Sequence, residues 1–205
     1  MKIGLSFVGI SHGTGRDYNH CFSNINEFLI APFKKDHDVK IYLTTYNTNS
    51  DNLIKLYDPV AYQFSDKSHQ MLTYIKSLEQ LRNQDLDFII STRFDIHFHK
   101  KINEINIDYT KFNALFKEKG WWDSMKFTTD NLFAFPSNMI DDFLFVLNSL
   151  YQNPSRHLQT DLHQAFSRMQ NKIGTDKTHI ISNVDELSNT NLFYSLCNTK
   201  WGIQK

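Results

Sequence analysis

One short segment combines side-chain types and spacing that could bind a charged ligand. In residues 91–99, Arg93 precedes Asp95 by two positions, and His97 and His99 follow at the same spacing. Carboxylate and imidazole groups both bind divalent cations, and a cation can bridge a diphosphate. If the chain stays extended here, Asp95, His97 and His99 share one face. The alternative is a salt bridge between Arg93 and Asp95, with both histidines on a solvated edge.

A glycine-rich loop near the amino terminus is the second candidate. Gly9 and Gly13 precede Arg16, and glycine just after a strand is typical of a backbone that turns sharply or approaches a ligand. The loop lacks the Gly-Lys-Ser/Thr of a P-loop, and Tyr18 stands where a dinucleotide fingerprint has its third glycine. Backbone amides and the planar guanidinium of Arg16 could still hold a diphosphate. An ordinary loop with a surface arginine is the alternative.

The elements that must position these residues follow from hydrophobic periodicity. Short β-branched or aromatic runs alternate with helical patterns, which predicts strands and helices in turn. The strands are expected at 3–10, 39–45, 60–64 and 87–92, and the helices at 19–34 and 68–83 with Ser68 as N-cap. This alternation predicts an α/β fold with a mostly parallel sheet. Ligands of such sheets bind beyond the carboxyl ends of the strands, where both candidate segments lie.

Two literal Asp-x-Asp triplets, 36–38 and 85–87, come before strands instead of after them. We therefore expect them at the other end of the sheet and without metal.

The second half of the chain is less regular. Its pattern predicts a polar connector over 100–119, strands over 126–135 and 178–182, helices over 138–151 and 160–171, and a surface wrap over 183–205. We expect one domain over 1–205, with a nucleotide-binding half at 1–100, an acceptor-side half at 101–182 and the wrap at its end.

Composition narrows the class of protein. The chain has 205 residues with 40% hydrophobic and 14% aromatic side chains, which predicts a packed globular protein. Lys+Arg and Asp+Glu number 22 each, so the basic excess of a nucleic-acid binder is missing. Cys21 and Cys197 are interpreted as free thiols in a reducing compartment, with one long-range bridge as the alternative. No apolar run is long enough to span a membrane.

The order of these features resembles the GT-A-type glycosyltransferases, in particular the small nucleotide-sugar enzymes of large DNA viruses and polysaccharide loci. The resemblance covers most of residues 2–170. It rests on the first strand and loop up to Arg16, the strand followed by Asn47, the Arg-x-Asp at Arg93, and an Asp–aromatic segment that begins at Asp130 before an apolar helix.

The resemblance implies a GT-A-like, Rossmann-type mixed sheet flanked by helices, and a UDP- or GDP-sugar donor held with Mn²⁺ or Mg²⁺. It assigns nucleotide contacts to Gly9, Arg16, Thr45 and Asn47, and we add Gly13 of the glycine-rich loop and Arg93 as further expected nucleotide contacts. Asp95 would correspond to the metal-binding end of an Asp-x-Asp motif. The sequence departs from that motif at the position two residues later, where His97 stands.

Sugar transfer places further demands on the residues. Charge on the departing diphosphate must be neutralised, and inversion needs a carboxylate that accepts the proton of the acceptor hydroxyl. We favour Asp161 as this base and then Asp130, which could otherwise orient a sugar hydroxyl. Asp123 is a third candidate. A helix cap or a surface carboxylate is the alternative for each of them.

Trp121 and Trp122 could stack on an acceptor sugar, with core packing as the alternative. With the resemblance, these residues predict transfer to a glycan or glycoprotein acceptor. The lack of a membrane-spanning apolar run predicts a cytoplasmic enzyme, in the host cytoplasm if the protein is viral. Another nucleotide-dependent transferase and a non-catalytic glycan-binding module remain alternatives.

Overall fold

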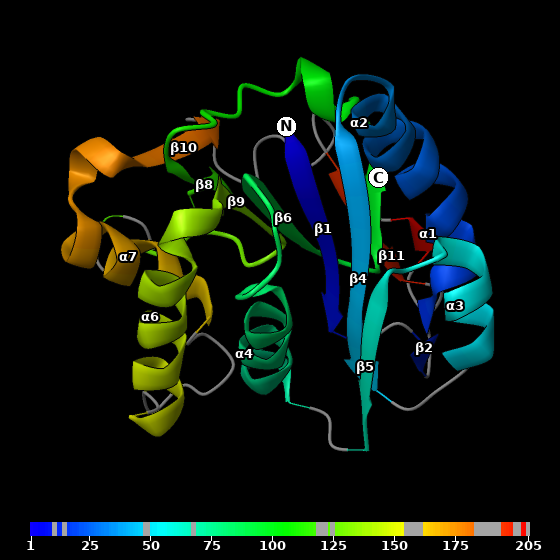
Figure 1. Ribbon diagram of the computed structural model, residues 1–205, viewed down its shortest axis with the longest axis horizontal. Coiled ribbons are helices and arrows are strands. Elements are labelled where there is room, and N and C mark those ends of the chain that lie inside the picture. Colours follow the sequence, from blue (N-terminus) through cyan, green and yellow to red (C-terminus); the bar gives the residue numbers. More distant parts are fainter. Residues whose placement is uncertain are drawn as a thin grey trace.

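The computed structural model describes residues 1–9, 12–13, 16–46, 50–66, 69–117, 123, 126–153, 162–182, 194–198 and 202–203. Its centre is a seven-stranded sheet with the order β10-β8-β9-β6-β1-β4-β5 (Figure 1). The strands are β1 (Lys2–Gly9), β4 (Asp38–Tyr46), β5 (Ala61–Ser65), β6 (Phe88–Arg93), β8 (Phe112–Phe116), β9 (Leu132–Pro136) and β10 (Thr178–Ser182). Only β9 runs against the others in this sheet. The prediction of a mixed, mostly parallel α/β sheet is confirmed.

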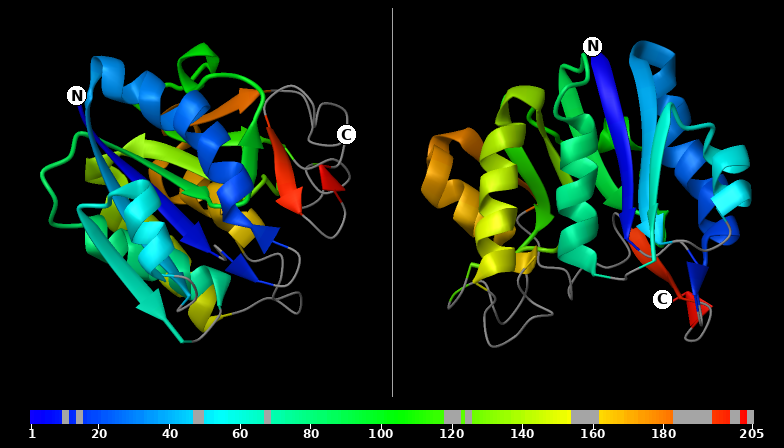
Figure 2. Two further views of the ribbon diagram at one scale, coloured as in Figure 1. Left: turned by 90° about the vertical axis from the view of Figure 1, so that its right-hand side faces the viewer. Right: turned by 60° about the horizontal axis from the view of Figure 1, so that its bottom comes forward.

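Helices cover both faces of the sheet, because successive strand residues point to opposite sides. Phe7 packs into one hydrophobic core and Val8 into the other. The Phe7 side is covered by α1 (Tyr18–Ile25), α2 (Ala31–Asp36) and α3 (Ser50–Tyr57). The Val8 side is covered by α4 (Gln70–Leu81), α6 (Ile140–Gln152) and α7 (Ala165–Ile173). Figure 2 shows the two groups of helices in further views.

The helix predicted over 19–34 is continuous but not uniform. Between α1 and α2 lies a π-helical turn, η1 (Asn26–Ile30). Pro32 follows directly and has no backbone N–H to donate to the carbonyl of Phe28, so the regular α-helical ladder is interrupted there. The Ala31 N–H instead bonds to the carbonyl of Asn26, five residues earlier.

Helix α3 and strand β8 are among the elements that the sequence did not predict. Helix α3 lies in a segment for which no element was predicted, and its buried Leu53 and Tyr57 are spaced to share one face. Strand β8 lies within the predicted polar connector, and all five of its residues are buried. The connector interpretation is therefore wrong for 112–116. The N-cap of α4 is His69, whose side chain accepts a hydrogen bond from Leu72 N at 3.4 Å, whereas the predicted N-cap Ser68 lies outside the described residues.

The end of the chain contributes more than a surface wrap. Strand β11 (Tyr194–Asn198) pairs antiparallel with β7 (Ile96–Phe98) on one side and with β12 (Gly202–Ile203) on the other. Residues 183–193 lie outside the description. Short strands β2 (His12–Gly13) and β3 (Arg16–Asp17) also pair with each other.

Cys21 is disulfide-bonded and fully buried. The interpretation of free thiols is therefore wrong, and the argument from free thiols for a reducing compartment no longer supports the expected cytoplasmic location. Within the parts of the chain described above, no helix has both the length and the apolar character that crossing a bilayer requires.

Candidate functional site

The chain changes direction across the sheet between β1 and β6. From β1 it continues to β4 and β5 on one side, and then returns to β6 on the other side of β1. Loops that leave the carboxyl ends of two such strands diverge, which makes this point the usual ligand crevice of an α/β sheet. Gly9 ends β1 and Arg93 ends β6. The Thr45 hydroxyl of β4 donates to the carbonyl of Gly9 at 2.6 Å, so three predicted nucleotide contacts share this edge.

The backbone at Gly9 explains the residue type. Its φ is +91°, a conformation that side chains of L-residues rarely adopt. A Cβ there would meet no heavy atom within 4 Å. Backbone conformation, not lack of space, therefore demands glycine at the end of β1.

Arg93 holds two carboxylates at the end of β6. Its Nε donates to Asp95 Oδ1 at 2.9 Å and its Nη2 to Asp95 Oδ2 at 2.8 Å, while its Nη1 lies 3.4 Å from Asp130 Oδ1. The three side chains are 16%, 8% and 6% exposed for Arg93, Asp95 and Asp130. Burial alone would lower the pKa of Arg93, but the charges of Asp130 and Asp95 outweigh it and raise that pKa. The salt bridge that the sequence left as an alternative is present, and Asp130 extends it.

Asp130 reaches the cluster because β9 is reversed. It lies two residues before β9, and Leu132 at the start of β9 pairs with Thr92 near the end of β6. The expected strand over 126–135 is thus shorter at its start. The Nε2 group of Gln70 donates to Asp130 Oδ2, and the Tyr74 hydroxyl donates to the Asp130 carbonyl at 2.8 Å. Burial, followed by the charge of Asp130, raises the pKa of Tyr74 well above its ordinary value.

The sequence analysis missed Gln70 and Tyr74. Their spacing of one helical turn at the start of α4 places them on one face, but nothing in the sequence says which strand that face meets. His163, which follows the predicted base by two positions, does reach the cluster. Its Nε2 lies 4.0 Å from Asp130 Oδ2, and its Nδ1 donates to the Thr128 carbonyl at 3.1 Å.

Tyr194 of β11 completes the surroundings of Asp130 from the end of the chain. Its hydroxyl lies 3.3 Å from the Thr129 hydroxyl and accepts a hydrogen bond from Asn131 Nδ2. The side-chain oxygens of Thr128 and Asn131 are buried and have no hydrogen-bond partner among the residues described. Buried polar atoms are nearly always satisfied, so these two oxygens indicate a place for a polar ligand or water.

His97 lies elsewhere. The chain turns at Phe94 and Asp95 before β7 begins, so the extended course that would align Asp95 with His97 is interrupted. His97 lines a pocket of about 500 Å³ with Ser23, Asn24, Glu27, Phe28, Phe98 and His99, and Asp95 is not part of its lining. The structure groups Asp95 with Arg93 and Asp130, and His97 with His99.

Asp95 and Asp130 bring two carboxylates to one place, and each of their four oxygens accepts a contact from Arg93 or Gln70. Counting one guanidinium against two carboxylates, the cluster keeps one formal negative charge in a buried place. Over the described ranges, no group of three His, Cys, Asp or Glu side chains forms a metal site. Mg²⁺ is commonly held by one or two carboxylates together with substrate phosphates, and that donor set is compatible with Asp95 and Asp130.

The other predicted residues are placed as follows. Gly13 in β2 pairs with Arg16 in β3, so both belong to the short hairpin after β1. Asp123 is exposed. Four candidates lie outside the described residues: Asn47, Trp121, Trp122 and Asp161.

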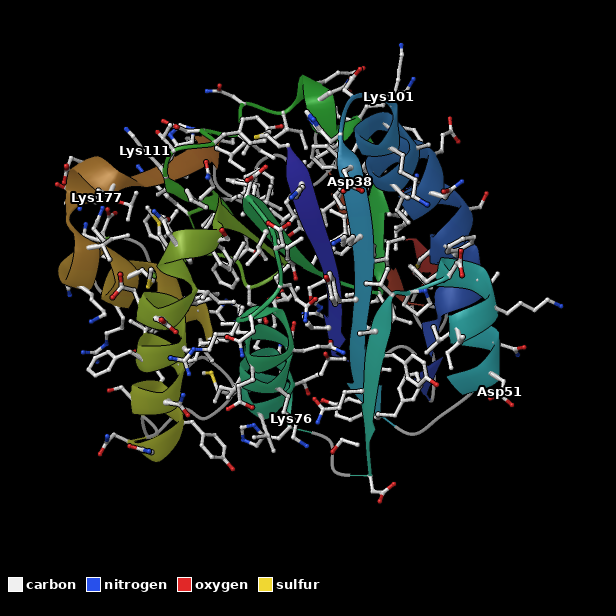
Figure 3. The ribbon with its side chains drawn as sticks, viewed as in Figure 1. Asp38, Asp51, Lys76, Lys101, Lys111 and Lys177 are labelled. Atoms are coloured by element: carbon white, nitrogen blue, oxygen red, sulfur yellow. The ribbon has the colours of Figure 1, made fainter. Side chains whose placement is uncertain are left out.

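The Asp-x-Asp triplets lie at the opposite edge of the sheet, as predicted. Asp38 is the first residue of β4, and Figure 3 shows it on the side of the sheet where β1 also starts. Asp87 lies just before β6 and accepts a hydrogen bond from Lys2 N at 2.8 Å.

Neither the models of known protein families nor the curated proteins contain a match to this chain.

Proposed function

We propose that this protein is a GT-A-type glycosyltransferase that transfers a sugar from a UDP- or GDP-sugar donor to a glycan or glycoprotein acceptor. The observation that carries the proposal is the buried Arg93–Asp95–Asp130 cluster at the carboxyl ends of β1 and β6, with its excess negative charge. The sequence resemblance to GT-A enzymes supports it, and the mixed, mostly parallel sheet is compatible with it.

Each described residue of the site has a task in this proposal. Asp95 and Asp130 would hold Mn²⁺ or Mg²⁺, which neutralises charge on the departing diphosphate when it is bound. The buried guanidinium of Arg93 fixes the position of both carboxylates through three contacts. Gly9, whose carbonyl accepts a hydrogen bond from the Thr45 hydroxyl, leaves the end of β1 without a side chain, and the preceding residue Val8 pairs with Arg93 of β6.

Proton transfer from the acceptor needs a carboxylate within hydrogen-bond reach. Asp161 remains the predicted base. Asp130 is the described alternative, and in that case Asp95 alone would hold the cation together with the diphosphate; Gln70 and Arg93 orient the two oxygens of Asp130, and His163 Nε2 faces Oδ2. A base at Asp130 would act with its position already fixed, which lowers the cost of reaching the reactive geometry.

A thermal-unfolding screen with nucleotides tests the class of function. We expect UDP or GDP with Mn²⁺ to raise the unfolding temperature more than ATP, adenosine phosphosulfates or the same nucleotides in chelator. Preference for adenine nucleotides would instead favour a sulfo- or nucleotidyltransferase.

Slow hydrolysis of a UDP- or GDP-sugar separates the enzyme from a glycan-binding module on the same fold. We expect wild-type protein to release free sugar with Mn²⁺ present, and Asp95→Asn to release none. Asp85→Asn is the matched control, since Asp85 is an exposed aspartate at the opposite edge of the sheet. Glycan binding without any hydrolysis of nucleotide sugars would contradict the proposal.

A further inference from the structure

His97 and His99 form a pair that the proposed sugar transfer does not use. Both line the pocket beside α1 and η1, and their ring centroids lie 5.4 Å apart with an interplanar angle of 52°. From this geometry we propose that they chelate a borderline-soft divalent cation of the Zn²⁺ class. This site is separate from the Asp95–Asp130 cation site and does not depend on the proposed function.

The separation of the rings suits a shared metal. Zinc binds imidazole nitrogen at roughly 2.0–2.1 Å, so two imidazoles on one tetrahedral zinc ion have centroids about 5 Å apart. The observed 5.4 Å is close to that value. Phe98 ends β7 and His99 follows at a bend, and the ring contact shows that the two imidazoles lie next to each other.

The backbone between the histidines is held from both sides. The Asn24 side chain of α1 donates from Nδ2 to the Phe98 carbonyl at 2.9 Å, and its Oδ1 accepts from Phe98 N at 2.5 Å. On the other side, Phe98 pairs with Tyr194 of β11. Because a metal site needs ligands that are already positioned, this support favours chelation.

The pocket around the two histidines contains polar groups, one of which lacks a hydrogen-bond partner among the described residues. The Nδ1 atom of His97 is buried and has no hydrogen-bond partner among the described residues. Ser23 and Glu27 line the same pocket, and Glu27 belongs to the π-helical turn η1. Such turns occur frequently at functional sites. A carboxylate beside the pocket adds favourable charge for a cation.

The expected site is open. Because no third His, Cys, Asp or Glu joins the pair as a ligand in the described part of the chain, water or a ligand from another molecule completes the coordination. Imidazole ligands suit Zn²⁺, Cu²⁺ and Ni²⁺, whereas Mg²⁺ and Mn²⁺ prefer oxygen. The two cation sites therefore differ in the metal that they select.

Isothermal titration of metal-free protein with ZnCl₂ tests the site, using wild type, His97→Gln, His99→Gln and the control His179→Gln. His179 is a single histidine of β10 whose Nε2 lies 3.0 Å from the Asn106 carbonyl. We expect each of the first two variants to weaken zinc binding about tenfold or more, and His179→Gln to leave it unchanged. Excess Mn²⁺ should not displace the zinc.

Several results would overturn the proposal: no zinc binding by the wild type, unchanged affinity in either His97→Gln or His99→Gln, or displacement of the zinc by Mn²⁺. Thermal unfolding of each variant in chelator checks folding. Glutamine preserves polarity at these partly exposed positions, so all three variants should unfold near the wild-type temperature. The zinc-dependent rise of that temperature should be lost in the first two variants alone.

Discussion

The central sheet has an amino edge, where β1 and β6 begin, and a carboxyl edge, where β1 and β6 end. Each of these two edges carries an ion pair, but the two pairs differ in their exposure to water. At the amino edge, Lys2 pairs with Asp85, and their side chains are 45% and 79% exposed. At the carboxyl edge, Arg93 pairs with Asp95, and their side chains are only 16% and 8% exposed. The pair at the amino edge raises the pKa of Lys2 and lowers that of Asp85, but water screens it. Burial of the charged residues, and not the presence of an Asp-x-Asp motif, therefore distinguishes a candidate site from surface charge.

The largest expected effect comes from removing the shared guanidinium. Arg93→Met leaves the buried carboxylates of Asp95 and Asp130 without their cation, so we expect a loss of about 3–5 kcal/mol in the free energy of unfolding. Urea denaturation measures it. Lys2→Met at the amino edge is the control and should change stability little, and equal losses in both variants would erase the contrast between the edges.

The second-largest loss of stability is expected from a change in the backbone at the end of β1. Gly9→Ala forces a side chain into a φ of +91°, and we expect it to cost about 1–2 kcal/mol of stability. Because a Cβ would clash with nothing there, the cost should come from strain alone. A urea midpoint equal to that of the wild type would show that this end of β1 relaxes easily.

A third prediction concerns alkaline pH. The raised pKa of Tyr74 means that the folded protein keeps this hydroxyl protonated where the unfolded chain, with a pKa near 10.0, loses its proton. The stabilisation is complete below pH 10 and is lost as pH rises toward the folded-state pKa. Tyr74→Phe should flatten the decline in stability above pH 10 and cost about 1 kcal/mol at neutral pH, because the Asp130 carbonyl loses its donor.

The control for that experiment is Tyr62→Phe, an exposed tyrosine of β5. It should show the same alkaline decline as the wild type. A decline that stays unchanged in Tyr74→Phe would assign the alkaline sensitivity to other groups.

The smallest effect is expected at the amino edge. Asp85→Asn removes an exposed ion pair, so its thermal unfolding should match that of the wild type at physiological salt. A large destabilisation would show that the Lys2–Asp85 ion pair contributes to folding stability, contrary to our interpretation of it as surface charge.

Much of the fold was predictable because apolar periodicity reports burial directly. The strands that became β1, β4, β6 and β10 are short segments rich in β-branched, aromatic or leucine residues. Strand β8 was missed because it is short, lies in a lysine-rich segment and carries Asn113. That amide accepts a hydrogen bond from Asp108 N and donates to the carbonyls of Asp108 and Lys111 and, across the sheet, to the Ala134 carbonyl at 2.9 Å. Sequence alone does not show such partners.

The site residues that follow a central strand could be predicted from the sequence. The residues that reach the site through long-range contacts could not. Arg93 and Asp95 follow a central strand, which identifies them. Gln70, Tyr74 and Tyr194 reach Asp130 or its neighbours across 56 or more residues of chain, and no local pattern encodes that. The turn at Asp95 separates His97 from the cluster, although their spacing alone suggested a shared face.

Binding of UDP and GDP in the presence of Mn²⁺, measured by isothermal titration on wild type, Asp95→Asn and Asp85→Asn, tests the central claim most directly. We expect metal-dependent binding of one nucleotide to the wild type and to Asp85→Asn, and its loss in a folded Asp95→Asn. Binding that needs no metal, or that survives in Asp95→Asn, would contradict a cation-held diphosphate at the carboxyl edge.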